Sequence, residues 1–278
     1  MNFRTKTFLF DVLSYVFLGF GAIVVVYPLV WMVEASFKQG AEFYVSPWGL
    51  PQRLVLENYR FAWQRGELLL GFFNSITVTC TSVVFICILA FLASYAFARM
   101  EFPGREIIYY SFLLSMIIPA QIQILPLFVI LKNLNAINRL SGLIIAHTSG
   151  GIAFSIFLLR AFLSAIPKEL EEAAYIEGCS RYKVLTTIIL PLSKPGLSTV
   201  IIFQGMGVWN DFFTSLILAN APKVRTLPLR IYFFMTQYVI DWSYVFATLT
   251  IVALPVIVLY LILQTQFISG LTAGALKG

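Results

Sequence analysis

Residues 68–98 read LLLGFFNSITVTCTSVVFICILAFLASYAFA, a run of 31 residues without a charged side chain. A helix needs about 20 apolar residues to cross the roughly 30 Å hydrocarbon core of a bilayer. The run exceeds this length and lacks the regular alternation of a β-barrel strand. In lipid, the backbone N–H and C=O groups of such a segment must be satisfied within a helix. The stretch therefore predicts a transmembrane helix over about 72–98.

Five further runs of this kind lie along the chain, at 12–33, 107–131, 140–159, 195–222 and 242–276. Only the run at 195–222 contains a charged residue, Asp211. Four prolines in or near these runs remove backbone donors and permit kinks: Pro28, Pro119, Pro126 and Pro255. We predict an all-α membrane protein with six transmembrane helices, at about 12–34, 72–98, 107–130, 142–163, 196–219 and 244–264.

Composition supports this fold class. Of the 278 residues, 59% are hydrophobic and 12% are charged, whereas soluble domains carry about 25% charged residues. The net charge of +6 comes from basic residues scattered between apolar runs, which fits lipid headgroups and topology and argues against nucleic acid as a partner. Three cysteines without a CxxC pair and a single histidine predict neither a disulfide framework nor a metal site.

The basic residues also suggest an orientation. The first apolar run is too long for a signal-peptide core, so we interpret it as an uncleaved first span. With the N-terminus inside, ten lysines and arginines fall in inner segments and nine in outer ones. Long loops count little in the positive-inside rule, and discounting the loop at 35–70 leaves ten against five. We therefore expect both termini in the cytoplasm.

One loop is different from the others. Residues 167–195 read PKELEEAAYIEGCSRYKVLTTIILPLSKP. A proline followed by acidic residues is typical of a helix start, and Gly178 interrupts the pattern. We predict two short helices joined at Gly178, the second running from Arg181 to about Leu190 and ended by Pro191. The segment is either an interfacial helix, which its four glutamates disfavour on anionic lipid, or a docking element for a cytosolic protein.

The same loop carries a resemblance to a known family. The pattern Glu172-Ala173-Ala174, Gly178, Ile188 and Leu190-Pro191 resembles the EAA loop of ABC-importer permeases, with mild departures at Glu177 and Cys179. The resemblance implies the type I importer permease fold, in which this loop forms a cytoplasmic coupling helix in a cleft of an ATPase subunit. By that likeness Glu172 pairs with polar or basic groups of the cleft, Ala173 and Ala174 pack in it, and Gly178 makes the turn.

Two further stretches are similar to carbohydrate-uptake permeases of the MalG type. Trp209-Asn210-Asp211-Phe212-Phe213 resembles their WND/WNE segment, and Gly270–Gly278 resembles their C-terminus. The likeness implies an N-terminal helix and external loop over 1–71, an ABC transmembrane type-1 core over 72–264 and a cytoplasmic tail over 265–278. We expect this tail to be extended and to contact the ATPase through Gly274, Lys277 and Gly278.

Polar groups inside spans are costly and usually face a protein interior or a cavity. Amides and carboxylates bind sugar hydroxyls, and aromatic rings cover apolar sugar faces. We therefore take five residues as candidates for the translocation path: Trp209, Asn210, Asp211, Gln121 and Gln123. The alternative for Asp211 is a helix cap or a pair at a contact with a partner permease. The lone His147 is more simply a hydrogen-bonded packing residue.

The motifs that the sequence lacks limit its possible functions. The chain has no G-x-x-x-x-G-K-[ST] loop, and it lacks the HExxH and G-x-S-x-G motifs of an intramembrane enzyme. We therefore expect no catalytic residue, no metal ligand and no cofactor in this chain, with ATP and Mg bound by a partner ATPase.

The resemblance implies the permease subunit of an ATP-driven, binding-protein-dependent importer of a mono- or oligosaccharide in a bacterial inner membrane. Its implied partners are a second, MalF-like permease, two ATPase subunits, an external sugar-binding protein and membrane lipid. An ion-coupled secondary transporter is the alternative function. It would usually show internal repeats or several intramembrane charges, and the sequence has no clear repeat and one carboxylate within a predicted span.

Overall fold

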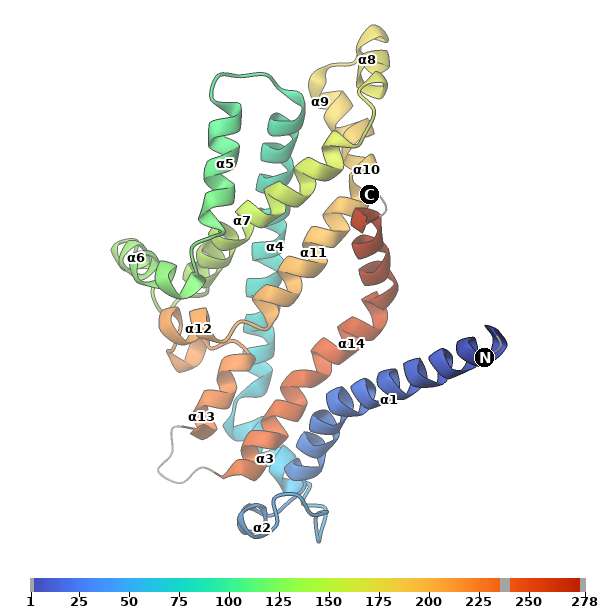
Figure 1. Cartoon of the computed structure of the whole chain (residues 1–278). Helices are drawn as coiled ribbons and strands as arrows, with labels where there is room; N and C mark the ends of the chain where they lie inside the picture. Colours follow the sequence, from blue (N-terminus) through green and yellow to red (C-terminus); the bar gives the residue numbers. More distant parts are fainter. Residues whose placement is uncertain (1–2, 236–240, 276–278) are drawn as a thin grey trace. The chain divides into compact units, whose positions relative to one another are not determined.

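The computed structural model describes residues 3–235 and 241–275, and side chains over 11–235, 241–258 and at 261. Over these residues every regular element is helical and no strand occurs (Figure 1). The chain divides into two compact units. One comprises residues up to Leu68 together with Arg230–Pro255, and the other comprises Leu69–Leu229 with the residues after Pro255. The predicted all-helical fold class is confirmed, and the domain boundaries at 71 and 264 stay a prediction.

The first unit is built from the N-terminal helix and a short helical loop. It contains α1 (Phe3–Ser36), α2 (Gly40–Val45), α3 (Glu57–Arg65), a 3-10 turn (Pro228–Ile231) that ends in this unit, α13 (Tyr232–Met235) and the first part of α14 (Trp242–Ala275). Over Asp11–Ser36, α1 is long and apolar enough to cross a membrane, and Pro28 lies inside it. The predicted first span is confirmed as a continuous helix.

Aromatic rings form much of the core of this unit. Trp31 of α1 packs edge-to-face on Phe246 with ring centroids 5.1 Å apart, and Phe61 stacks on Tyr244 at 4.3 Å. The loop after α1 is held by Lys38, whose buried ammonium donates to the carbonyls of Ser46 and Pro47. Within 35–71 and 220–243, Tyr59 packs on Phe37 with ring centroids 5.2 Å apart and Trp242 stacks on Phe43 at 6.0 Å, so several aromatic residues of these loops have a packing role within the chain.

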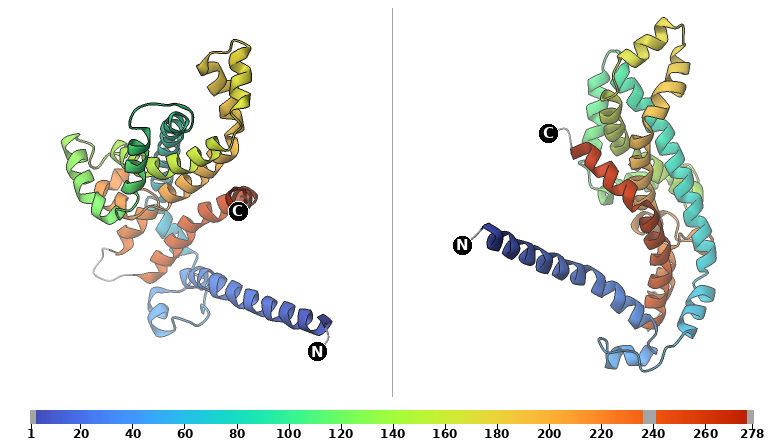
Figure 2. Two further views of the ribbon diagram at one scale, coloured as in Figure 1. Left: turned by 45° about the horizontal axis from the view of Figure 1, so that its top comes forward. Right: turned by 90° about the vertical axis from the view of Figure 1, so that its right-hand side faces the viewer.

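The second unit holds the remaining helices. They are α4 (Leu68–Arg99), α5 (Arg105–Ser115), α6 (Ala120–Asn133), α7 (Leu140–Ser164), α8 (Glu169–Ile176), α9 (Arg181–Val184), a π-helical turn (Leu185–Ile189), α10 (Leu190–Leu192), α11 (Lys194–Trp209), α12 (Phe213–Leu218) and a 3-10 turn (Pro222–Val224). Figure 2 shows the α8–α9 segment at one end of this unit in both views. This position leaves one side of the segment free of other elements of the unit.

Helices α4, α7 and α11 form the centre of the second unit. Gly151 of α7 lies between them, since a Cβ added there would come within 2.6 Å of Ile86 on α4 and 2.8 Å of Gln204 on α11. The Gln204 amide donates to the Gly151 carbonyl and to the Ser155 hydroxyl. Gly151 therefore permits a close approach of α4, α7 and α11, and the hydrogen bonds of Gln204 stabilise the contact between α7 and α11.

The predicted third span is not one helix. It is broken between α5 and α6, which meet at 105°. Pro119 lies at the break with φ −56° and ψ 136°, and a proline also disfavours helical conformation in the residue before it. The pair is either a broken span or a re-entrant loop, and the prediction of a continuous helix over 107–130 is wrong.

The predicted fifth span is also interrupted. Helix α11 ends at Trp209 and α12 begins at Phe213, so a continuous helix over 196–219 is wrong. By contrast, α14 is longer than predicted and runs to Ala275. The extended conformation expected from 265 onward is therefore wrong over 265–275, where apolar residues continue the helix.

Span counting follows from these helices. Within the described residues, three helices are long and apolar enough to cross a membrane, and there are up to five spans if each bent pair counts as one. Over Trp242–Val258, where its side chains are described without a gap, α14 counts as a shorter apolar helix. The total of six spans stays a prediction.

Candidate functional site

The loop at 167–195 forms two short helices joined at Gly178, as predicted. Helix α8 ends in a Schellman motif, in which the Cys179 N–H donates to the Ala174 carbonyl and the Gly178 N–H donates to the Tyr175 carbonyl. Gly178 has φ +78°, a left-handed conformation that glycine adopts without the steric cost of a Cβ. Ser180 then caps α9 by accepting from the Lys183 N–H. The sharp turn is thus specified by local sequence.

The second helical stretch does not stop at Pro191, contrary to prediction. It continues through a π-helical turn and α10 to Leu192, and the stretch from Arg181 meets α11 at 68°. A π turn is wider than an α turn and relieves the clash between a proline ring and the carbonyl four residues earlier. Ile188 is half-buried against the core, whereas Leu190 and Pro191 are exposed.

Helix α8 has an outer and an inner face. The outer face exposes Glu172, Ala173 and Ile176, and Ile176 is 85% exposed. The inner face buries Glu171 and Ala174, which are one turn apart as helical periodicity requires. Ala174 packs within the hydrophobic core of its own chain. Of the two alanines expected to pack on a partner, only Ala173 is free to do so.

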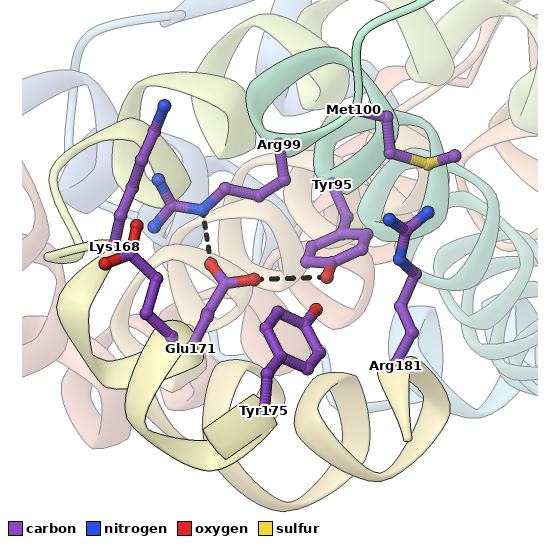
Figure 3. Close-up of a pocket in the computed structure, with 8 residues that line it drawn as sticks. Tyr95, Arg99, Met100, Lys168, Glu171, Tyr175 and Arg181 are labelled. Carbon is purple, nitrogen blue, oxygen red and sulfur yellow. Dashed lines mark hydrogen bonds and ion pairs between the residues drawn. The ribbon is translucent and has the colours of Figure 1, made fainter. Parts of the chain in front are cut away.

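The inner face is anchored by a buried ion pair that sequence reasoning missed. Arg99 Nε at the end of α4 lies 2.6 Å from Glu171 Oε1, and both side chains are less than 10% exposed. The Tyr95 hydroxyl donates to Glu171 Oε2 at 3.1 Å. Figure 3 shows these groups converging on Glu171. The signal available was the helical spacing, which places Glu171 and Ala174 on one face.

A small cavity lies beside this ion pair. Its volume is about 160 Å³, and its lining includes Lys168, Glu172, Tyr175 and Arg181. Figure 3 shows the Arg181 and Lys168 side chains on opposite sides of the Glu171 carboxylate. The cavity is therefore polar and surrounds the attachment of α8 to α4.

The residues predicted for a translocation path have different surroundings in this chain. The Trp209 ring is buried and packs edge-to-face on Phe72 of α4 at 5.9 Å. Asn210 is exposed, and its amide donates to the Met206 carbonyl at the end of α11. Gln121 is exposed on α6. The Gln123 amide donates to the carbonyls of Ser115 and Ile118, across the bend between α5 and α6.

Asp211 occupies the break between α11 and α12. Its carboxylate accepts from the backbone N–H groups of Thr214 and Ser215 and from the Ser215 hydroxyl. An acidic side chain there satisfies backbone donors that the first turn of a helix leaves unpaired. Asp211 thus caps α12, which is the structural role weighed for it from sequence.

The residues predicted to contact an ATPase from the tail are only partly described. Gly274 lies within α14. Lys277 and Gly278 lie outside the described residues.

Comparison with known proteins identifies the family that carries this arrangement. The family model of binding-protein-dependent transport system inner membrane components matches residues 86–272, a range that includes α7, the α8–α9 segment and α11. The chain belongs to this family. Its members are inner-membrane transport subunits of ABC importers that work with an ATPase and a substrate-binding protein, which excludes the ion-coupled secondary transporter.

Individual relatives and a solved structure agree with the family. The chain is 30% identical to the diacetylchitobiose uptake permease NgcG of Streptomyces coelicolor, covering 96% of this chain and 89% of that protein. It is 34% identical to the probable starch degradation products permease AmyC of Thermoanaerobacterium thermosulfurigenes, covering 90% and 91%. A bacterial ABC transporter that imports alginate has the same fold, with a TM-score of 0.79 at 23% identity over 95% and 98% of the two chains.

Proposed function

We propose that this chain is the permease subunit of an importer that carries a sugar into the cell at the expense of ATP. The observation that carries the sugar assignment is the pair of near-full-length relatives named for diacetylchitobiose and starch degradation products. In this proposal ATP and Mg are bound by two partner ATPase subunits, and a second permease completes the membrane pore. A sugar-binding protein delivers substrate from outside, and both termini of this chain lie in the cytoplasm.

The outer face of α8 is the proposed contact with the ATPase. Glu172 offers a carboxylate, Ala173 permits close backbone approach, and Ile176 presents a large apolar side chain with little burial in its own chain. Exposed apolar side chains beside a polar rim are typical of protein interfaces. Nucleotide-driven movement of the ATPase would then displace α8, and the attached helices would rock between inward- and outward-open states.

The residues at the break between α11 and α12 are the proposed edge of the sugar path. Asn210 is the exposed member of the predicted trio, and its amide could exchange an internal hydrogen bond for one to a sugar hydroxyl. Asp211 supplies negative charge next to it. We assign Trp209 to packing, because its ring is buried against Phe72.

Cysteine crosslinking in the assembled complex tests the proposal. The three native cysteines, Cys80, Cys87 and Cys179, are first replaced, and a single cysteine is introduced as Ile176→Cys. A short bifunctional reagent should join this position to the co-purifying ATPase subunit. Leu50→Cys is the matched control, since Leu50 is 81% exposed on the loop between α2 and α3, and it should give no such product.

Transport measurements complete the test. Vesicles containing the complex should take up labelled oligosaccharide only with binding protein outside and ATP inside. If Ile176→Cys reacts only with reagents added from the outside, or if no ATPase accompanies the chain, the proposed coupling role fails. Uptake by the chain alone without ATP would contradict the proposed energy source.

A further inference from the structure

An arginine at the end of α4 contacts both α8 and the chain that precedes it. Arg99 stands at the last position of α4. Its Nε atom lies 2.6 Å from Glu171 Oε1, and its Nη2 atom donates to the Ile166 carbonyl at 2.6 Å. Ile166 lies between the end of α7 and the start of α8. One guanidinium thus holds α4, the chain leaving α7 and the coupling helix together.

The contact has the properties of a rigid link. An arginine guanidinium is planar and presents several donors in a fixed geometry. The Arg99 and Glu171 side chains are 6% and 8% exposed, so water screens their attraction less than it screens a surface pair. The Tyr95 hydroxyl, one turn earlier on α4, binds the second oxygen of the same carboxylate. Both oxygens of Glu171 are therefore tied to α4.

Two of the three glutamates of α8, Glu171 and Glu172, lie on different faces of the helix. Glu171 is turned inward to Arg99, whereas Glu172 is exposed on the face that we assign to the ATPase. Beyond α8 the chain passes through Gly178 and a π-helical turn before it reaches α11. The path from α8 to α4 through Arg99 is shorter and is made of buried polar contacts.

We propose that Glu171, Arg99 and Tyr95 form a strut that makes α8 and α4 move as one body when the ATPase displaces the coupling helix. The three are positioning residues, and their role rests on the proposed function. The strut converts a push on the outer face of α8 into movement of a membrane-spanning helix. Without it, only the packing of Ala174 and the chain connections would transmit a displacement of α8 to α4.

Distance measurements between spin labels test the strut directly. Labels are placed at Leu170→Cys on α8, a residue outside the set assigned to the ATPase contact, and at Val84→Cys on α4, two side chains that are 44% and 55% exposed. The measurement uses the complex with its ATPase and without native cysteines. In the otherwise unaltered chain, the distance distribution should stay the same between the nucleotide-free state and the state trapped with ATP, Mg and vanadate. In Glu171→Gln, the distribution should shift or broaden on trapping.

Matched variants separate a strut from general destabilisation. Glu169→Gln alters an exposed carboxylate in the first turn of the same helix and should behave as the unaltered chain. The charge swap Arg99→Glu with Glu171→Arg should partly restore a distance distribution that stays the same on trapping. If Glu171→Gln fails to assemble, Arg99→Lys decides, because it keeps the charge but removes the planar set of donors that reaches both Glu171 and the Ile166 carbonyl. A wider distribution supports the strut, and an unchanged one overturns it.

Two results would overturn the proposal. One is a distance that changes on trapping in the unaltered chain, and the other is a Glu171→Gln complex in which α8 and α4 stay at one distance. These results differ from failure of the proposed function, in which the unaltered chain brings no ATPase through purification. If the ATPase co-purifies but α8 moves relative to α4 on trapping, the strut is overturned and the proposed function stands.

Discussion

The Asp211 carboxylate oxygen Oδ2, just before α12, lies 3.7 Å from Nε2 of His147 on α7. The same oxygen accepts from the Ser215 N–H and hydroxyl. Both side chains are largely buried. Asp211 therefore has a structural role at the break after α11, and the lone histidine of the chain is its neighbour.

The capping role predicts different outcomes for two substitutions of Asp211. Asp211→Ala removes the acceptor for two backbone N–H groups and should destabilise the chain by about 0.5–2 kcal/mol. Asp211→Asn keeps a good capping side chain and should leave thermal stability in detergent and assembly with partners nearly unchanged.

Sugar uptake by the Asp211→Asn variant tests whether the carboxylate also has a role in transport. If Asp211 also borders the sugar path, Asp211→Asn should lower uptake of labelled sugar while the complex assembles normally. Uptake and assembly that fall together in Asp211→Asn would contradict a path role and leave only the cap.

Gly178 offers a test of the turn after α8. Gly178→Ala places a Cβ at φ +78°, which costs about 1–2 kcal/mol in the left-handed region, although no neighbouring atom lies within 4 Å of the added carbon. The strain should distort the Schellman motif. We expect fewer ATPase subunits per purified chain and lower uptake.

Gly104→Ala is the matched control for that prediction. Gly104 has φ +79° and equally open surroundings, at the start of α5. It should produce a similar loss of stability with ATPase binding retained. Equal loss of ATPase binding in both variants would mean that strain alone, and not the position of α8, explains the effect.

The sequence predicted those features that depend on nearby residues. The apolar run at 68–98 corresponds to α4, and the glycine between two helix-forming stretches corresponds to the turn at Gly178. In both cases the signal and the structure lie within a few residues of each other. Hydrophobic length and a left-handed glycine act locally, so no knowledge of the rest of the fold was needed.

Features set by distant contacts were not predictable in the same way. Arg99 and Glu171 are far apart in sequence, and nothing local to either shows that the two are paired. The prolines were equally ambiguous, since Pro28 lies inside a continuous helix and Pro119 lies at a 105° break. The same residue type gives either result depending on what packs around it.

The packing of α7 against its neighbours predicts opposite effects at two adjacent glycines. Gly151→Ala would drive its Cβ into Ile86 and into the Gln204 amide, at 2.6 and 2.8 Å. The amide would have to leave its bonds to the Gly151 carbonyl and the Ser155 hydroxyl. Overpacking of this kind costs about 1–3 kcal/mol, which a lower melting temperature of the purified chain would show.

Gly150→Ala serves as the control on the same helix. No atom of another residue outside its own helix backbone lies within 4 Å of a Cβ at this position, and alanine is the better helix former. This variant should match or exceed the stability of the unaltered chain. A loss at Gly150 as large as that at Gly151 would mean that the close approach of α4, α7 and α11 is not what Gly151 provides.

Asn74 holds the segment after α12 through hydrogen bonds to its backbone. Its buried amide donates to the carbonyls of Lys223 and Arg225, and the neighbouring Ser75 hydroxyl accepts from the Leu227 N–H. Asn74→Ala leaves two carbonyls without this donor, which should cost about 1–3 kcal/mol. Amide hydrogen exchange should accelerate over 222–227 while α7 stays protected. Thr77→Ala removes only a bond to the Phe73 carbonyl on the same helix and should leave exchange of that segment unchanged. Equal acceleration in both variants would mean that the Asn74 amide does not hold residues 222–227.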